Sequence, residues 1–243
     1  MTIQMLQGGF LDVMQAASPL DFRREVVKFG ESLGFKTVSA TSIIDQRGGL
    51  KFHCVDNTPA AYSQSFRDPS LGQVDPVMQH CKHAAVPIIW DQDTYVSRGR
   101  ADVWDDQARY GYRTGIALAL HMPEGRHFFL GVDRDRPLPK NPRAITRIVA
   151  ELQLFAVHAQ EAAFRVFSEL DPQTEPPDRP ALTPREQEAL RWTMDGKTAW
   201  EVGTIMSISE RTAVLHLQNA MHKLNCVTKH QAVLKAIRLG IFS

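Results

Sequence analysis

The stretch from Ser209 to Leu224 carries side chains whose chemistry suits contact with nucleic acid. Its hydroxyl and cationic groups can donate hydrogen bonds to phosphate oxygens, and the amide of Gln218 can pair with the edge of a base. Val214 and Leu215 would face the same groove and contact thymine methyl groups. An ordinary helical bundle with a basic outer face would show the same pattern, so periodicity alone leaves both interpretations open. The candidate DNA contacts are Ser209, Arg211, Thr212, Val214, Leu215, Gln218, His222 and Lys223.

Helix start signals predict the elements that would position these side chains. A threonine stands three residues before a glutamate or glutamine, the spacing of a capping box, at Thr183–Glu186, Thr198–Glu201 and Thr228–Gln231. Ser209 is placed as the N-cap of the next helix, whose apolar residues form one stripe: Ala213, Leu217, Ala220 and Leu224. Gly203 lies near the preceding turn, where a Cβ atom would hold two helices apart. This arrangement is typical of a helix-turn-helix, whose second helix enters the major groove.

A second group of residues, in the first half of the chain, could bind a small polar head group. An ionised Asp75 can accept a charge-assisted hydrogen bond from a ligand amide, and the indole N–H of Trp90 can donate to a carbonyl oxygen. Gly115 would let a ligand or a helix approach a strand closely. Each residue also has a simpler interpretation. Asp75 followed by Pro76 is a good helix start, and Trp90 can be an ordinary core aromatic.

The C-terminal part of the chain resembles the DNA-binding domain of LuxR-type transcription regulators. An almost unbroken series carries the resemblance: Leu182-Thr183-Pro184-Arg185-Glu186, Leu190, Trp192, Gly196-Lys197-Thr198, Glu201-Val202, Ile208-Ser209-Glu210-Arg211-Thr212, His216, Asn219-Ala220-Met221, Lys223-Leu224 and Gln231-Ala232-Val233. A series of this length is far more specific than a single short motif. It implies a homodimer that binds an inverted-repeat promoter site in double-stranded DNA, with RNA polymerase as a further candidate partner.

Between Asn57 and Gly115 the sequence is similar to the signal-binding domain of the same family. Members of the family bind N-acyl-homoserine lactones in a pocket between an antiparallel sheet and helices. The matching segments are Asp75-Pro76-Val77, Pro87-Ile88-Ile89-Trp90 and Gly111-Tyr112-Arg113-Thr114-Gly115. The resemblance implies ligand contacts at Thr58, Tyr62, Phe66, Asp75, Pro76, Trp90 and Gly115.

This chain departs from the family pattern at four positions of the expected pocket. Thr58 stands where a tyrosine is usual, Tyr62 replaces a tryptophan, and Phe66 replaces a tyrosine. Gly131 stands where a ligand-facing hydroxyl is common. Hydrogen bonding to an acyl amide and its carbonyl is therefore expected to be weaker than usual, whereas the Asp75 and Trp90 pair is retained.

Hydrophobic periodicity predicts an α+β protein of two domains. Residues 1–170 are expected to form an α-β-α sandwich with an antiparallel sheet. Its expected helices span 18–34, 103–110 and 145–170, with a helical region at 60–85, and its strands span 35–43, 50–55, 115–121 and 127–133. Residues 171–180 carry four prolines and are interpreted as a linker. Residues 181–243 are expected to form an all-α, four-helix helix-turn-helix domain.

The long helix at 145–170 has apolar residues at alternating steps of four and three. Such a seam favours packing on a partner helix of a homodimer, although packing on the chain's own sheet would produce it too. The seam consists of Ile145, Val149, Leu152, Ala156, Ala159, Ala163, Val166 and Leu170.

The distribution of charge along the chain is consistent with a basic DNA-binding domain attached to a less basic domain. The formal net charge is only +1, but lysine and arginine outnumber the carboxylates after residue 180. The three cysteines are far apart and are expected to be reduced. The chain has no basic and apolar leader at its start, and no uncharged apolar stretch approaches the roughly 20 residues that span a bilayer. We therefore expect a cytoplasmic protein with no membrane partner.

Motifs for metal binding and catalysis are weak or missing. His80-Cys81-Lys82-His83 looks like a metal cluster, but adjacent residues point to different faces of a helix, so we expect no metal and no cofactor. The sequence has no Gly-x-Ser-x-Gly, no His-Glu-x-x-His and no glycine-rich phosphate loop, which argues against an enzyme. Asp133-Arg134-Asp135-Arg136 alternates in charge and is interpreted as a solvated hairpin end.

Together these features predict a quorum-sensing transcription regulator that binds a small hydrophobic signal, an N-acyl-homoserine lactone, and DNA. The alternative is a regulator of the same family that needs no ligand or responds to a small molecule other than a lactone.

Overall fold

The computed structural model describes residues 9–46, 49–59, 71–168 and 180–242. The chain forms two compact units, one before and one after the segment 169–179. The predicted linker at 171–180 lies outside the described residues apart from Pro180, so the proposed domain boundaries remain a prediction.

The first unit is built on a five-stranded antiparallel sheet in the order β2-β1-β5-β4-β3. Its strands are β1 (Thr37–Gln46), β2 (Gly49–Asp56), β3 (Ile88–Trp90), β4 (Thr114–Met122) and β5 (Arg126–Arg134). A short turn of 3-10 helix, η2 (Pro123–Gly125), joins β4 to β5. Four of these strands were predicted. β3 was missed because three residues are too few to display an alternating pattern.

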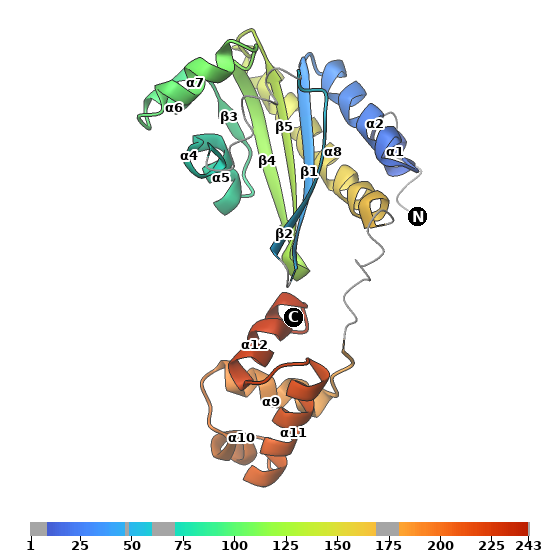
Figure 1. Cartoon of the computed structure of the whole chain (residues 1–243), viewed down its shortest axis with the longest axis vertical. Coiled ribbons are helices and arrows are strands. Elements are labelled where there is room, and N and C mark those ends of the chain that lie inside the picture. The colour runs from blue at the N-terminus through green and yellow to red at the C-terminus, as the bar shows by residue number, and fades with distance from the viewer. Residues whose placement is uncertain (1–8, 47–48, 60–70, 169–179, 243) are drawn as a thin grey trace. The chain divides into compact units, whose positions relative to one another are not determined.

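Helices cover both faces of this sheet (Figure 1). One face carries α1 (Gly9–Met14), α2 (Pro19–Ser32) and α8 (Pro142–Ser168). The other face carries α4 (Leu71–Val74), α5 (Pro76–His83), α6 (Gln92–Val96) and α7 (Ala101–Ala108). The predicted α-β-α sandwich is therefore confirmed. α1 and α6 were not predicted, and the expected helical region at 60–85 is described only from residue 71 onward.

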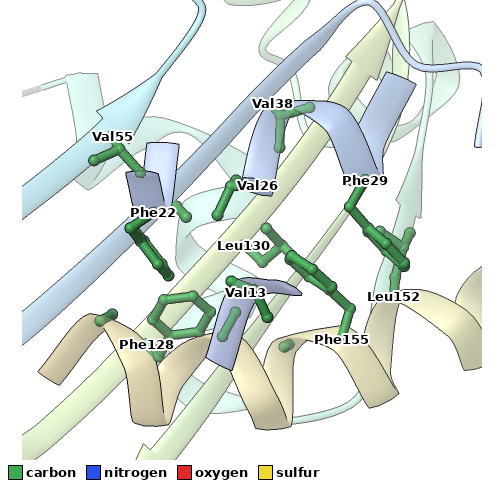
Figure 2. Close-up of a cluster of buried hydrophobic side chains, with 14 of the residues drawn as sticks. Val13, Phe22, Val26, Phe29, Val38, Val55, Phe128, Leu130, Leu152 and Phe155 are labelled. Carbon is green, nitrogen blue, oxygen red and sulfur yellow. The ribbon is translucent and has the colours of Figure 1, made fainter. Parts of the chain in front are cut away.

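The long helix α8 packs on its own sheet. Phe155 is fully buried and stacks on Phe29 of α2, with ring centroids 3.9 Å apart and planes 7° from parallel. Figure 2 shows these rings among core side chains from the sheet, α1 and α2. Most residues of the seam that was predicted to pack on a partner helix are buried in this core, namely Leu152, Ala156, Ala159, Ala163 and Val166. Its regular spacing is therefore explained without a second chain.

The second unit is the predicted four-helix domain. It consists of α9 (Pro184–Met194), α10 (Ala199–Ile205), α11 (Glu210–Lys223) and α12 (Lys229–Arg238). The capping boxes at Thr183, Thr198 and Thr228 are all present, with both reciprocal hydrogen bonds formed. Leu190, Val202, Leu217 and Leu224 contribute to its buried core.

The turn between α10 and α11 depends on the absence of a side chain at Gly203. The Gly203 carbonyl accepts a hydrogen bond from the N–H of Ile208 at 2.9 Å. A Cβ atom at residue 203 would lie 3.0 Å from the Ile208 carbonyl oxygen and 3.1 Å from the nitrogen of Glu210. The close approach of two helices expected from the sequence is therefore confirmed.

Gly30 offers a test of how tightly α2 packs on the sheet. A Cβ atom at this position would lie 2.2 Å from Cγ2 of Val38 on β1. Gly30→Ala should therefore destabilise the first unit by about 1–3 kcal/mol, although alanine has the higher helix propensity. Hydrogen exchange of α2 and β1 amides in the full chain measures this loss. Adding Val38→Ala should recover part of it by removing the clashing methyl group, whereas purely additive losses would contradict the proposed contact.

Candidate ligand pocket and DNA interface

Asp75 combines a structural role with a position in the expected pocket. Its Oδ1 caps α5, accepting from the N–H groups of Val77 at 2.7 Å and Met78 at 2.9 Å, and Pro76 occupies the first turn. The simpler interpretation of Asp75-Pro76 as a helix start is therefore correct. The second oxygen, Oδ2, accepts a hydrogen bond from the Tyr95 hydroxyl at 3.1 Å, which directs the carboxylate toward a buried aromatic cluster.

A row of paired residues across the sheet carries further polar groups near Asp75. Trp90 on β3 pairs with Gly115 on β4, Gly115 pairs with Asp133 on β5, and Asp133 pairs with Thr37 on β1. Cross-strand partners project from the same face of a sheet, here the face covered by α5, α6 and α7. We call Trp90, Gly115, Asp133 and Thr37 the polar row.

Within the polar row, Gly115 makes room for its two neighbours. A Cβ atom at Gly115 would lie 2.7 Å from Cε2 of Trp90 and 2.7 Å from Oδ1 of Asp133. The sequence predicted that this glycine admits a ligand or a helix. The structure corrects this expectation, because the indole ring and the carboxyl group take the space directly above Gly115.

Asp133 was wrongly interpreted as part of a solvated hairpin end. Its side chain lies on the pocket face, and burial, together with the negative charge of Asp75, raises the pKa of Asp133 to about 8. Arg134 was also misread, since it is buried, lies over the ring of Phe35 and donates to the carbonyls of Arg136 and Pro137. Only Asp135 and Arg136 are exposed as expected. Strand alternation was the missed signal, because Asp133 lies two residues after Gly131 and so shares its face.

Small side chains form a floor next to the polar row. Ala117 on β4 pairs with Gly131 on β5, and Gly131 pairs with Ser39 on β1. Ala119 continues the floor along β4. The substitution at Gly131 noted from the sequence therefore belongs to a strip of small residues. The ring of Phe129 lies against this strip, since a Cβ atom at residue 131 would be 3.1 Å from Cε1 of Phe129. The strip and this ring form a mostly apolar surface beside the polar row.

Three further polar residues surround this region and were not predicted as site residues. Tyr95 is 1% exposed, its ring meets Trp90 edge to face at 5.8 Å, and burial and Asp75 raise the pKa of its hydroxyl. Gln107 is 4% exposed, and its amide nitrogen has no hydrogen-bond partner in the part of the chain that the structure describes. Burial raises the pKa of Tyr112 to about 12, opposed by hydrogen bonding with Thr58.

The sequence-predicted ligand contacts are thus partly assembled. Trp90 and Gly115 are in contact on one face of the sheet, and Asp75 is linked to Trp90 through Tyr95. Thr58 opposes the rise that burial causes in the pKa of the Tyr112 hydroxyl. Pro76 is buried in the first turn of α5. Tyr62 and Phe66 lie outside the described residues.

The candidate DNA contacts lie mostly on the exposed side of α11. Arg211, Val214, Leu215, Gln218 and His222 are exposed there, opposite the buried Ala213, Leu217 and Ala220. Ser209 is the N-cap, accepting from the Thr212 N–H at 3.1 Å, and the two hydroxyls are 2.8 Å apart. Ser209 and Thr212 therefore define the start of the helix that carries the other candidates.

Lys223 differs from the other candidates because it is engaged within the unit. Its ammonium group donates to Oε2 of Glu186 at 2.8 Å and lies 3.3 Å from the carbonyl oxygen of Ala181. Glu186 is 3% exposed. Burial by itself would raise the pKa of Glu186, but the hydrogen bonds from Lys223 and from the Thr183 backbone outweigh burial and lower it. The structure therefore gives Lys223 a role in joining α11 to α9, and its contact with phosphate stays a prediction.

Comparison with known proteins identifies the family. Residues 18–163 match the autoinducer binding domain, and residues 180–236 match the luxR family of bacterial regulatory proteins. The transcriptional activator SolR of Ralstonia nicotianae is 32% identical over 188 residues, which cover 76% of each chain. The chain belongs to the LuxR family.

Two solved structures share the fold of this LuxR-family protein. Escherichia coli SdiA superposes with a TM-score of 0.69 at 24% identity, over 95% of this chain and 94% of SdiA. CepR2 of Burkholderia cenocepacia has a TM-score of 0.58 at 17% identity, over 68% of this chain and 96% of CepR2. The protein is a quorum-sensing transcriptional regulator with an autoinducer-binding domain and a DNA-binding helix-turn-helix.

The described residues contain neither a membrane-spanning helix nor a metal-binding cluster. No helix there is long and apolar enough to cross a membrane. Nor do three His, Cys, Asp or Glu side chains in the described ranges come together to hold a metal ion, so the run from His80 to His83 forms no such group.

The Glu186–Lys223 ion pair predicts how this LuxR-family protein responds to substitution. Lys223→Ala should destabilise the DNA-binding unit by about 1–3 kcal/mol, because it leaves a buried carboxylate without its partner. Since the pKa of Glu186 is lowered on folding, the stabilisation is present at neutral pH and is lost as the pH falls through that lowered pKa. Hydrogen exchange of α9 and α11 amides at neutral and acidic pH measures both effects. The exposed Arg211→Ala is the control and should leave exchange unchanged, whereas equal protection in Lys223→Ala would contradict a structural role.

Proposed function

We propose that this regulator binds an N-acyl-homoserine lactone in its first unit and an inverted-repeat DNA site as a homodimer. The observation that carries the ligand proposal is the convergence of Asp75 and the polar row beside a floor of small residues. Carboxylate and indole N–H groups suit the amide and carbonyl groups of the head, and the floor suits an acyl chain. Burial of the signal stabilises the folded chain by mass action, since the unfolded chain offers no such site.

Two structures of the same fold support an acyl ligand and also define the second candidate. CepR2 is described as N-acylhomoserine lactone dependent, and SdiA has been solved in complex with octanoyl-rac-glycerol. Because Thr58 and Gly131 replace larger hydrogen-bonding side chains of the family, an acyl compound without a lactone ring is the second candidate ligand. A regulator that needs no ligand is the remaining alternative.

The DNA proposal rests on the exposed side of α11. Two copies of this helix would enter major grooves about one helical turn apart, as the two-fold symmetry of a dimer requires. Arg211 and Thr212 are placed at the start of the helix, where they would contact phosphates, and His222 lies near its end. Gln218 would pair with an adenine edge, and Val214 and Leu215 would contact thymine methyl groups.

Both units have exposed apolar side chains that a partner protein could cover. Leu154 and Val157 lie on the outer side of α8, 41% and 49% exposed, and Leu234 and Ile237 of α12 are 62% and 50% exposed. These surfaces would be buried in the homodimer. Trp200 of α10 is 63% exposed and lies on a different helix from the candidate DNA contacts, which makes it a candidate contact for RNA polymerase.

Asp75→Asn tests the ligand site without removing the helix cap, because asparagine caps helices as well as aspartate does. The exchange replaces an acceptor-only carboxylate by an amide. We expect affinity for N-acyl-homoserine lactones to fall by about 10- to 100-fold, the effect of losing one hydrogen bond to a charged group. The shift in melting temperature of the full chain across a panel of acyl lengths measures this loss.

Asp91→Asn is the matched control for that experiment. Asp91 also caps a short helix, α6, but its side chain is exposed and bonds Thr94. It should respond like the wild type. An unchanged response in Asp75→Asn would remove Asp75 from the pocket. Stabilisation of the wild type by octanoylglycerol but by no lactone would favour the second candidate, and stabilisation by neither would favour a ligand-independent regulator.

Gln218→Ala tests the base contact. It should cost about 1–3 kcal/mol of discrimination at one base pair of the preferred site while leaving non-specific binding nearly unchanged. Arg211→Ala, as the comparison variant, should weaken binding to all sequences alike and reduce the salt dependence by about one phosphate contact. Binding of both variants to the preferred site and to its single-base variants, at several salt concentrations, separates the two effects. Equal losses on every sequence for Gln218→Ala would contradict base reading.

A further inference from the structure

Asp133 occupies the centre of the polar row, yet the family resemblance assigns it no role. Its Oδ1 lies against Gly115, beside the Cε2 atom of Trp90. Cε2 is bonded to the indole nitrogen, so the N–H edge of Trp90 and the carboxyl group of Asp133 lie next to each other. The carboxyl group is therefore within the part of the pocket that would receive the polar end of a ligand.

No described residue satisfies this carboxyl group. Within the described ranges, neither a backbone N–H nor a side chain hydrogen-bonds to it, and its carbonyl oxygen alone accepts from Lys36 and Thr37. Among the described residues, the charged group that acts on it is the carboxylate of Asp75, the N-cap of α5. The other titratable groups that sense its charge are the hydroxyls of Tyr95 on α6 and of Tyr112 before β4.

This environment decides the protonation state of Asp133. Burial and the like charge of Asp75 raise its pKa to about 8, so it is mostly a neutral carboxylic acid at neutral pH. A carboxylic acid donates one hydrogen bond, whereas a carboxylate only accepts. Asp75 is already occupied by two backbone N–H groups and the Tyr95 hydroxyl. Asp133 can therefore donate a hydrogen bond to a ligand, whereas Asp75 can only accept one.

We propose that the protonated carboxyl group of Asp133 donates a hydrogen bond to a carbonyl oxygen of the bound acyl signal. The O–H of Asp133 and the N–H of Trp90 form a pair of adjacent donors, which suits one carbonyl oxygen. Asp133 thereby supplies a donor on the same face as Gly131, where the chain lacks the hydroxyl usual in its family. This proposal rests on the proposed function, because it names a contact of the same signal.

The proposal predicts a pH dependence of ligand binding with a defined sign. Ionisation of Asp133 removes the donor and turns a negative oxygen toward the carbonyl, so affinity falls as the pH rises through the pKa. Titration of the full-length protein with the acyl-homoserine lactone that stabilises it best, from about pH 6.5 to about pH 9.5, should show affinity falling by up to about tenfold per pH unit above the pKa.

Variants at Asp133 separate a ligand contact from a merely structural role. Asp133→Asn keeps an N–H donor and cannot ionise, so it should bind within a few-fold of the wild type and lose the pH dependence. Asp133→Ala removes the donor and should bind about tenfold more weakly at neutral pH. Asp135→Asn changes an exposed carboxylate on the same strand end and should retain the wild-type pH profile. Melting temperatures without ligand verify that each variant is folded.

The outcomes distinguish this proposal from the proposed function. The lactone ring opens in base, but that loss affects Asp133→Asn equally and is removed by the comparison. A pH dependence that persists in Asp133→Asn, an affinity that rises with pH, or wild-type binding by Asp133→Ala would each overturn the role of Asp133 alone. Failure of the wild type to bind any N-acyl-homoserine lactone would overturn both this proposal and the lactone-binding function.

Discussion

The antiparallel register through Gly115 is the constraint on which the ligand site depends. Trp90, Gly115 and Asp133 are direct neighbours on three adjacent strands, and they are brought together only when β3, β4 and β5 pair in this one register. A slip by one residue on β5 would turn Asp133 to the opposite face, toward α8. The hydrophobic residues on that opposite face, such as Ile116 and Val132, therefore hold the polar row in place by their own burial.

The second unit could be predicted from the sequence in greater detail than the first because its signals are local. Each capping box spans three residues, and a helix stripe repeats within one or two turns. The starts of α9, α10, α11 and α12 accordingly agree with the residues that predict them. Pairing of Trp90 with Gly115 or of Thr37 with Asp133 joins distant parts of the chain, and no local pattern specifies such a pairing.

For two ionisable residues, Asp133 and Lys223, the sequence did not reveal the surroundings in the fold, and the physical reason is the same. The charges around Asp133 alternate in a way that is typical of solvent-exposed loops, and Lys223 lies on a helix whose outer face is polar. What decides their roles is a distant partner: Asp75 for Asp133, and Glu186, 37 residues away, for Lys223. The sequence gives the type of each side chain, but it does not show whether a positive or a negative group will lie beside that side chain in the fold.

The surroundings of Glu186 and of Asp133 have opposite effects on the charge of the two carboxyl groups, and the two residues therefore have different roles. Glu186 is buried against a cation and the N–H group of Thr183, so it keeps its charge and joins α11 to α9. Asp133 is half-buried beside a like charge and without a donor from a described residue, so its raised pKa of about 8 favours the neutral acid near neutral pH. A half-buried acid without a hydrogen-bond partner among the described residues adds little to the stability of the fold. A carbonyl oxygen of the proposed signal would give this carboxyl group the hydrogen-bond partner that the described residues do not provide.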